Sequence, residues 1–243
     1  MSAGRWLCAM VAWLHMNYNE AFLTARTQLP GTRMTPSPKN VFVAYCELLG
    51  MSCARPTDCC FSLTGFSQRG GGTGIHEHGW GISFYEGRGF RSFTDTLPAS
   101  TSPVAALLKG YPIKTLTMLA HIRYATVGGI LLENVHPFSR ELWGIHWSFA
   151  HNGDVPAFAS GRCDVQGDLC DGTLSAGSHS VGGVQFRPVG DTDSESLFCA
   201  LLNALNREFP QGPPPADALF TAVDRFSREA CQPLPQAQLQ EEG

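Results

Sequence analysis

The run from residue 41 to residue 50 reads Val41-Phe42-Val43-Ala44-Tyr45-Cys46-Glu47-Leu48-Leu49-Gly50. Apolar side chains dominate it, and β-branched and aromatic residues are frequent, which is typical of a buried β-strand. The run therefore predicts a strand early in the chain. This strand carries Cys46, which is a candidate nucleophile.

Further strands and helices are expected on the C-terminal side of this run. Strands are predicted at residues 80–86, 88–93, 115–124 and 143–152, the first two as a hairpin. Helices are predicted at residues 56–67, 103–109, 193–209 and 216–231. Such a mixture of strands and helices indicates an α+β domain built in layers.

Three segments are expected outside this domain, which we place at residues 46–231. Residues 1–45 form an N-terminal extension or propeptide with a linker, residues 157–186 an exposed insertion, and residues 232–243 a disordered tail. The insertion holds six glycines and scattered Ser and Asp, so it has little apolar surface to bury.

The beginning of the extension contains an apolar run, residues 6–14. Nine residues are too few to span a bilayer. The run has the length of a signal-peptide core, but no small-x-small cleavage site follows it. We expect either a short amphipathic helix at about residues 6–27, a propeptide, or an upstream stretch that comes from a misplaced start.

The overall composition excludes several classes of protein. The 243 residues carry a net charge of -4 with mixed signs, which provides neither the basic stripe of a nucleic-acid-binding protein nor a polybasic membrane anchor. The nine cysteines form no Cys-x-x-Cys pair, and no Asn-x-Ser/Thr sequon occurs. We therefore expect a cytoplasmic protein with mostly reduced thiols and without nucleic-acid or membrane partners.

Cys46 requires a base if it is to act as a nucleophile. A Cys/His pair is one route, and the available imidazoles are His76, His78, His121, His136 and His151. A second route is cleavage immediately before Cys46, since a free α-amine has a pKa of about 7.7 to 8.0 and can accept the thiol proton. The third interpretation is a structural thiol in the core.

Four motifs in the chain resemble those of class II glutamine amidotransferases, closest to the YafJ-like branch, within the N-terminal nucleophile hydrolase superfamily. The motifs are Cys46-Glu47-Leu48-Leu49-Gly50-Met51-Ser52; Gln68-Arg69-Gly70-Gly71 with Gly79-Trp80-Gly81-Ile82; His121-Ile122-Arg123-Tyr124-Ala125-Thr126 with Asn134-Val135-His136-Pro137-Phe138; and His151-Asn152-Gly153 with Gly190-Asp191-Thr192-Asp193-Ser194-Glu195. The resemblance implies a four-layer αββα sandwich, which this chain would leave incomplete at its C-terminus.

The resemblance also implies a role for individual residues. Cys46 would attack the side-chain amide of glutamine, and the Asn152 side chain and the Gly153 backbone N–H would stabilise the oxyanion. The guanidinium of Arg123 would bind the substrate α-carboxylate and Asp193 the α-ammonium. Thr126 would donate a hydrogen bond to the bound glutamine.

A purely structural role is an alternative interpretation for several of these residues. Arg123 at a strand end also fits a surface ion pair, and Asp193 before an apolar helix also fits an N-cap. Arg69, Trp80 and His136 are candidate supporting residues that are equally compatible with a structural role. His76 and His78 lack the further ligands of a metal site, so we expect neither a metal nor another cofactor.

The chain departs from the family pattern before Cys46, at His78 and in the insertion at residues 157–186. Forty-five residues precede Cys46, so removal of an initiator Met does not free its amine. His78 stands where this branch usually has Asp, and the insertion enlarges the loop that leads to Asp193.

The expected activity is hydrolysis of glutamine or a related γ-glutamyl amide, with the ammonia released or passed to an accepting protein. One alternative is a truncated or blocked homologue without activity. Another is a Cys/His hydrolase that uses Cys46 while the extension is still attached.

Overall fold

The computed structural model describes residues 9–14, 21–26, 46–126, 128–158 and 185–230. Two antiparallel four-stranded sheets form its centre. The first sheet has the order β3 (Glu47–Asp58), β6 (Lys114–Ile122), β4 (Trp80–Glu86) and β5 (Gly89–Asp95). The second has the order β2 (Ala21–Arg26), β1 (Ala9–Leu14), β8 (Ile145–Asn152) and β7 (Phe138–Leu142).

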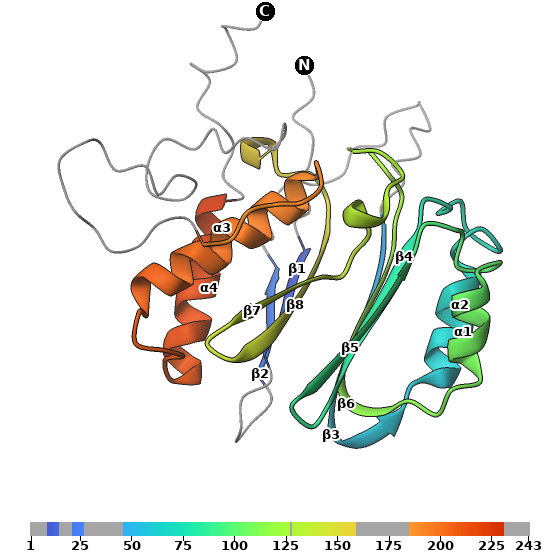
Figure 1. Cartoon of the computed structure of the whole chain (residues 1–243), viewed down its shortest axis with the longest axis horizontal. Coiled ribbons are helices and arrows are strands. Elements are labelled where there is room, and N and C mark those ends of the chain that lie inside the picture. Colours follow the sequence, from blue (N-terminus) through green and yellow to red (C-terminus); the bar gives the residue numbers. More distant parts are fainter. Residues whose placement is uncertain (1–8, 15–20, 27–45, 127, 159–184, 231–243) are drawn as a thin grey trace, which may run out of the picture.

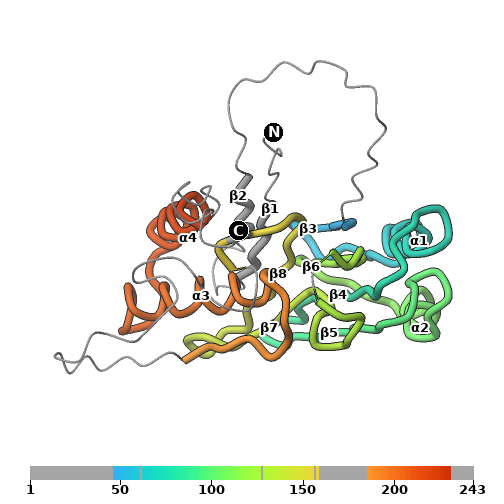
Figure 2. The backbone as a smooth tube through the Cα atoms, turned by 90° about the horizontal axis from the view of Figure 1, so that it is seen from above, coloured from blue at the N-terminus to red at the C-terminus, as the bar shows by residue number. Residues whose placement is uncertain are grey.

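Helices cover the outer faces of the two sheets. The pair α1 (Cys60–Gln68) and α2 (Pro103–Lys109) packs on the first sheet, and the pair α3 (Asp193–Glu208) and α4 (Ala216–Ala230) packs on the second. Figure 1 shows the resulting helix–sheet–sheet–helix order, and Figure 2 shows the helix pairs at opposite ends. The α+β fold and its four layers are thus as expected from the sequence.

Strand β6 shows why the centre of this fold is buried on both sides. Met118, Ala120 and Ile122 point into the apolar core beneath α1 and α2. Leu119 packs in the other direction, in the small apolar cluster between the sheets, and His121 makes a hydrogen bond to β8. Alternation along one strand therefore serves two different layers.

Strand β8 is the counterpart of β6 in the second sheet. Phe149 stacks on Phe198 of α3 with ring centroids 5.0 Å apart. Ser148 faces the first sheet, where its Oγ lies 2.6 Å from Ser83 Oγ of β4. Between the sheets, hydrogen bonds thus accompany a small apolar cluster.

Most predicted elements are present, several with shifted ends. The strand expected at residues 41–50 is described from Glu47 and continues to Asp58, so Cys46 lies just before it. The helix expected from Pro56 begins at Cys60, since β3 continues to Asp58. The Asp58 carboxylate then accepts a hydrogen bond from the Cys60 N–H at 2.8 Å, which favours a helix start after the strand. The strand expected from residue 143 begins at Ile145.

A tight turn explains the late start of β8. Leu142 pairs with Ile145, so Trp143 and Gly144 form a two-residue hairpin turn. Their φ angles are 62° and 72°, as the turn that matches the twist of a hairpin requires. The apolar character of Trp143 was therefore misleading about its backbone conformation.

The expected amphipathic helix at residues 6–27 is wrong for the part of that segment that is described. Residues 9–14 and 21–26 form β1 and β2, which pair with each other. β1 also pairs with β8, from Ala9 opposite Asn152 to Leu14 opposite Trp147. Strand pairing satisfies backbone groups along the β8 edge, which a helix would leave without partners.

The expected exposed insertion, residues 157–186, is contradicted at its two ends. Ala157 and Phe158 are buried, as is Phe186, and all three belong to the core beneath α3. Residues 159–184, the linker and the C-terminal tail lie outside the described residues. Within the described part of the chain, no helix has both the length and the apolar character that crossing a membrane requires.

Candidate active site

Cys46 lies immediately before β3, and its thiol contacts the loop that follows β6. The Tyr124 N–H donates to Cys46 Sγ at 3.2 Å, and Tyr124 O lies 3.4 Å from the sulfur. Burial raises the pKa of the Cys46 thiol, although the Tyr124 hydrogen bond and the charge of Arg123 act in the opposite direction. Without a base, the thiol is therefore mostly protonated at neutral pH.

Asn152 connects Cys46 with the interior of the sandwich. It is the last residue of β8, and its Nδ2 donates to the Cys46 carbonyl oxygen at 2.6 Å. Its Oδ1 lies 3.0 Å from Nε2 of His121. Gly153 follows with a φ of 124°, a conformation that glycine adopts more readily than other residues.

Arg123 follows β6 directly and is buried, with 4% of its surface exposed. Its guanidinium donates to the carbonyl oxygens of Gly129 at 2.8 Å and Gly128 at 3.3 Å. Burial lowers the pKa of Arg123, while Cys46 and Asp191 raise it. The interpretation of Arg123 as a surface residue is therefore wrong.

Asp193 is the first residue of α3, but it is not the cap of this helix. The N-cap is Thr192, whose Oγ1 accepts from the Glu195 N–H at 3.3 Å. Asp193 Oδ2 instead accepts from the Val155 N–H at 2.7 Å, and burial raises the pKa of this carboxyl. The carboxylate thus joins α3 to the segment that follows Gly153.

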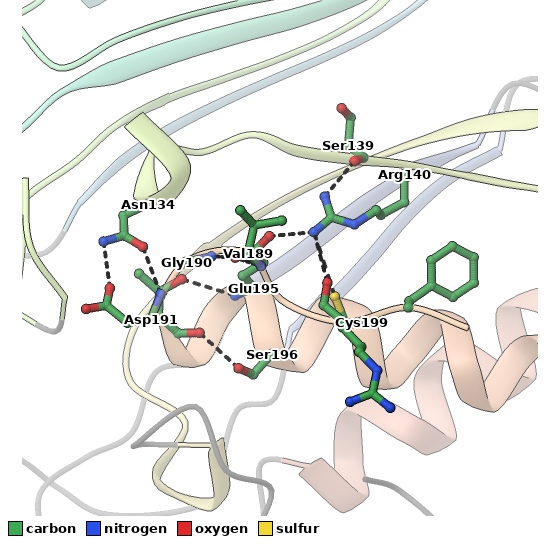
Figure 3. Close-up of polar contacts among 12 residues, drawn as sticks. Asn134, Ser139, Arg140, Val189, Gly190, Asp191, Glu195, Ser196 and Cys199 are labelled. Carbon is green, nitrogen blue, oxygen red and sulfur yellow. Dashed lines mark hydrogen bonds and ion pairs between the residues drawn. The ribbon is translucent and has the colours of Figure 1, made fainter. Parts of the chain in front are cut away.

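The side chains of Glu195 and Asn134 hydrogen-bond to the segment that leads into Asp193 (Figure 3). Glu195 accepts from the backbone N–H groups of Val189 at 3.1 Å and Gly190 at 2.7 Å, and it pairs with Arg140 at 2.5 Å. The Asn134 side chain binds the Asp191 carboxylate at 2.6 Å and the Asp191 N–H at 3.1 Å. Glu195 and Asn134 therefore order this backbone as it enters α3.

The remaining predicted site residues lie around this group. Thr126 is exposed and donates to Asp154 Oδ1 at 3.2 Å. Arg69 is also exposed and forms an ion pair with Glu47 at 2.8 Å, one residue beyond Cys46. Trp80 belongs to the core beneath α1 and α2, and His136 stacks on His121 with ring centroids 4.3 Å apart.

Three buried histidines form a cluster that the sequence did not predict as a group. Burial lowers the pKa of His121 to about 3 and that of His151 to about 4, and it lowers the pKa of His136 well below its usual range. All three rings are therefore neutral at physiological pH. His121 and His151 lie on buried strands and His136 lies just before β7, and this placement in the sequence was the only signal for the cluster.

In the part of the chain that the structure describes, the hydrogen bonds given for His78, His121 and His151 lead to groups other than the Cys46 thiol. His121 reaches Cys46 through Asn152, and His151 Nδ1 lies 3.0 Å from Ser194 Oγ. His78 accepts from the Ala125 N–H at 2.8 Å. This arrangement does not favour a Cys/His pair. No group of His, Cys, Asp and Glu side chains among the described residues is suited to bind a metal ion.

Comparison with known proteins agrees with the motif pattern. The family described as glutamine amidotransferases class-II matches residues 45–233. The chain is 48% identical over 187 residues to the "Putative glutamine amidotransferase YafJ" of Escherichia coli, which covers 77% of this chain and 66% of that protein. It is 41% identical over 187 residues to a "Putative glutamine amidotransferase" of Haemophilus influenzae, with 77% and 56% covered.

A solved structure from Pseudomonas aeruginosa, titled as a predicted glutamine amidotransferase, is 40% identical and gives a TM-score of 0.47, with 76% of this chain and 64% of that chain covered. The chain thus spans about two thirds or less of the length of these relatives. It belongs to the class II glutamine amidotransferases, on the match that extends over most of its length.

Proposed function

We propose that this chain hydrolyses the side-chain amide of glutamine, with Cys46 as the nucleophile. The Cys46 thiolate attacks the amide carbon, and the amide oxygen becomes an oxyanion. The oxyanion accepts hydrogen bonds from the Asn152 side chain and the Gly153 N–H. Collapse of this intermediate breaks the C–N bond and expels ammonia, which leaves a γ-glutamyl thioester on Cys46. Water then hydrolyses the thioester to glutamate and the free thiol.

The observation that carries this proposal is the proximity of Asn152 to Cys46. The Asn152 Nδ2 lies 2.6 Å from the Cys46 carbonyl oxygen, although 106 residues separate the two in the sequence. This contact brings an amide N–H donor to the backbone of the residue that carries the thiol, and an oxyanion hole requires such a donor near the nucleophile. Loss of one such donor typically costs about 100- to 1,000-fold in rate.

Arg123 and Asp193 support a free amino acid as the substrate. Both are buried and of opposite charge, and both flank the segments that hold Cys46 and Asn152. A guanidinium suits an α-carboxylate and a carboxylate suits an α-ammonium, so together they would select glutamine over a residue within a peptide. Thr126 at the exposed side would add a hydrogen bond to the bound substrate.

The base in this mechanism is the α-amine of Cys46 itself. The amine takes the thiol proton and later transfers a proton to the departing nitrogen, so that ammonia leaves as a neutral molecule. An amide bond between Tyr45 and Cys46 removes that basicity. We therefore propose that residues 1–45 are an extension that is cut from the amidotransferase domain of residues 46–231 immediately before Cys46. Because β1 pairs with β8, the cut extension would stay bound to that domain.

A glutamate-release assay on chains of known N-terminal mass tests the proposal. Residues 40–45 are replaced by a recognition sequence for a site-specific protease that cuts immediately before Cys46. We expect no activity before the cut and glutamine turnover after it. Activity of the uncut chain would instead indicate a Cys/His hydrolase, and an inactive cut chain that is folded would indicate a blocked homologue.

Two substitutions in the cut chain identify the nucleophile. Cys46→Ala removes the attacking sulfur, so turnover should fall to the background rate while the circular dichroism spectrum stays unchanged. Cys53→Ala is the matched control, because Cys53 is a half-buried free cysteine in β3, the strand that follows Cys46. It should retain activity within about 2-fold, since it removes no group that the mechanism uses. Turnover by Cys46→Ala would show that another group attacks the amide.

Comparing substrates addresses the finer question of specificity. Hydrolysis of free glutamine is the expected activity, and other γ-glutamyl amides are the second candidate class. The ammonia is either released or accepted by a second protein. Ratios of kcat/KM for glutamine and for γ-glutamyl amides with larger leaving groups distinguish the two classes of substrate.

A further inference from the structure

The side-chain amide of Asn152 faces a different partner at each end. Its Nδ2 donates to Cys46 O at 2.6 Å, and its Oδ1 lies 3.0 Å from His121 Nε2. A carbonyl oxygen accepts hydrogen bonds and does not donate them. The amide must therefore direct its NH2 group toward Cys46, which leaves its oxygen for His121.

This orientation determines which nitrogen of His121 carries the proton. Two acceptors would repel each other at 3.0 Å, so Nε2 must donate to Asn152 Oδ1. The ring is fully buried, and burial lowers the pKa of His121 to about 3. At neutral pH the ring therefore holds one proton, and the contact with Asn152 assigns it to Nε2.

The position of the imidazole is determined by the fold rather than by a loop. His121 lies on β6, an inner strand of the first sheet, opposite Leu48 of β3 and Gly81 of β4. Its ring also stacks on His136 at 4.3 Å. Asn152 ends β8 in the second sheet, so the hydrogen bond connects the two sheets at the candidate site.

We infer that His121 is a positioning residue, which holds the Asn152 amide with its NH2 group toward the reacting carbonyl. This inference rests on the proposed function, since it concerns the same oxyanion. The oxyanion, like the Cys46 carbonyl, only accepts hydrogen bonds. Without a donor at position 121 only the Cys46 carbonyl holds the amide orientation, and a flipped amide would direct its oxygen at the developing negative charge.

Three substitutions in the protease-cut chain test this inference. A glutamine at position 121 places an N–H donor near the position of Nε2, whereas an asparagine is one methylene shorter and leucine has no donor. His121→Leu and His121→Asn should lower kcat about 100-fold or more with KM changed less than about 3-fold. His121→Gln should restore kcat to within about 10-fold of the parent chain.

The comparison of Gln with Asn separates positioning from folding, because both place an uncharged amide in the same buried site. A purely structural role for His121 predicts similar losses for these two variants. Equal kcat values for His121→Gln and His121→Asn, or full activity of His121→Leu, would overturn the inference.

A second measurement does not depend on turnover. Nitrogen-15 NMR of the parent chain should show His121 protonated at Nε2, and the Asn152 side-chain amide should exchange slowly in the parent and in His121→Gln but rapidly in His121→Asn. A His121 ring protonated at Nδ1 would overturn the inference even in an active enzyme. The expected NMR result in a cut chain without glutaminase activity would instead retain the positioning contact and reject the proposed function.

Discussion

The candidate site has a buried side and an exposed side, and the two are held in different ways. On the buried side, His121, Asn152 and Asp193 each bond to a partner from another layer or segment. On the exposed side, Arg69 pairs with Glu47 and Thr126 with Asp154, all within reach of water. Water competes more strongly for the exposed contacts than for the buried and partly buried ones, so the buried side is held more rigidly.

This difference explains why the proposed chemistry is assigned to the buried side. Orientation of an oxyanion donor contributes to catalysis when the donor does not need to reorganise during the reaction. The amide of Asn152 is held at both ends, whereas Thr126 has one exposed partner. The buried side is therefore suited to stabilise charge, and the exposed side to admit and recognise substrate.

Acid should have the largest effect, and it should act through the buried side. The folded-state pKa values of His121 and His151, about 3 and about 4, lie below the ordinary value of 6.5. Above pH 6.5 the free energy of unfolding has its full value with respect to these histidines. It decreases as the pH falls from 6.5 toward the folded-state pKa values, because the unfolded chain then binds more protons than the folded chain. The free energy of unfolding should fall by up to about 1.4 kcal/mol per pH unit for each histidine.

The raised pKa of Asp193 has the opposite effect on stability, because this carboxyl is protonated more easily in the folded chain than in the unfolded chain. It therefore offsets part of the loss of unfolding free energy that the histidines cause. Urea unfolding between pH 7 and pH 5 measures the slope. His151→Leu should make it shallower, whereas Thr221→Val should not, because Thr221 is exposed and carries no titratable group. An equal effect of both changes would contradict the assignment of the slope to buried rings.

Removing one acidic side chain on each side of the site should lower the free energy of unfolding by different amounts. Glu195 has a side chain that is 2% exposed and binds Arg140 and two backbone N–H groups, so Glu195→Gln should cost about 3 kcal/mol of unfolding free energy. Glu47 is 30% exposed in its pair with Arg69, so Glu47→Gln should cost less than about 1 kcal/mol. Urea unfolding at neutral pH measures both, and equal losses would remove the distinction between the two sides.

The smallest effect is expected at Thr126. If its hydroxyl donates to the bound glutamine, Thr126→Val should raise KM about 2- to 10-fold with kcat nearly unchanged, as expected for one hydrogen bond at an exposed position. Steady-state kinetics of the cut chain measure this change. Thr221→Val, on the outer helix α4, provides the exposed control and should leave KM as it was. A loss confined to kcat would instead assign Thr126 to the chemical step.

Sequence patterns predicted the elements whose signals are local. The helix over residues 103–109 has Ser102 as its cap and Pro103 at its first position, and the strand over residues 80–86 is a short, mainly apolar run that Gly87 ends. Residues 9–14 and 21–26 had no such decisive signal, because a short apolar run fits either a helix or a strand. Of the two, β1 pairs with β8, which lies more than 120 residues away in the sequence, and β2 pairs with β1.

The site was predicted in a similar way, residue by residue but without its connections. The motifs indicated Cys46, Arg123, Asn152 and Asp193 as candidates. In the structure Cys46 contacts Tyr124, which follows Arg123, and Asn152, while Asp193 contacts Val155 in the segment after Asn152. They did not indicate that Thr192 rather than Asp193 caps α3, or that Arg123 is buried. Burial and capping depend on what packs around a residue, which the motif does not contain.

The sequence by itself determined most of the strands and helices after Cys46, the order of the motifs and Cys46 as the candidate nucleophile, because these follow from local side-chain chemistry and spacing. Only the tertiary structure decided that His121 of one sheet meets Asn152 of the other, and which way the Asn152 amide points. That contact forms where two sheets pack face to face. No local pattern in either strand encodes its partner across the interface.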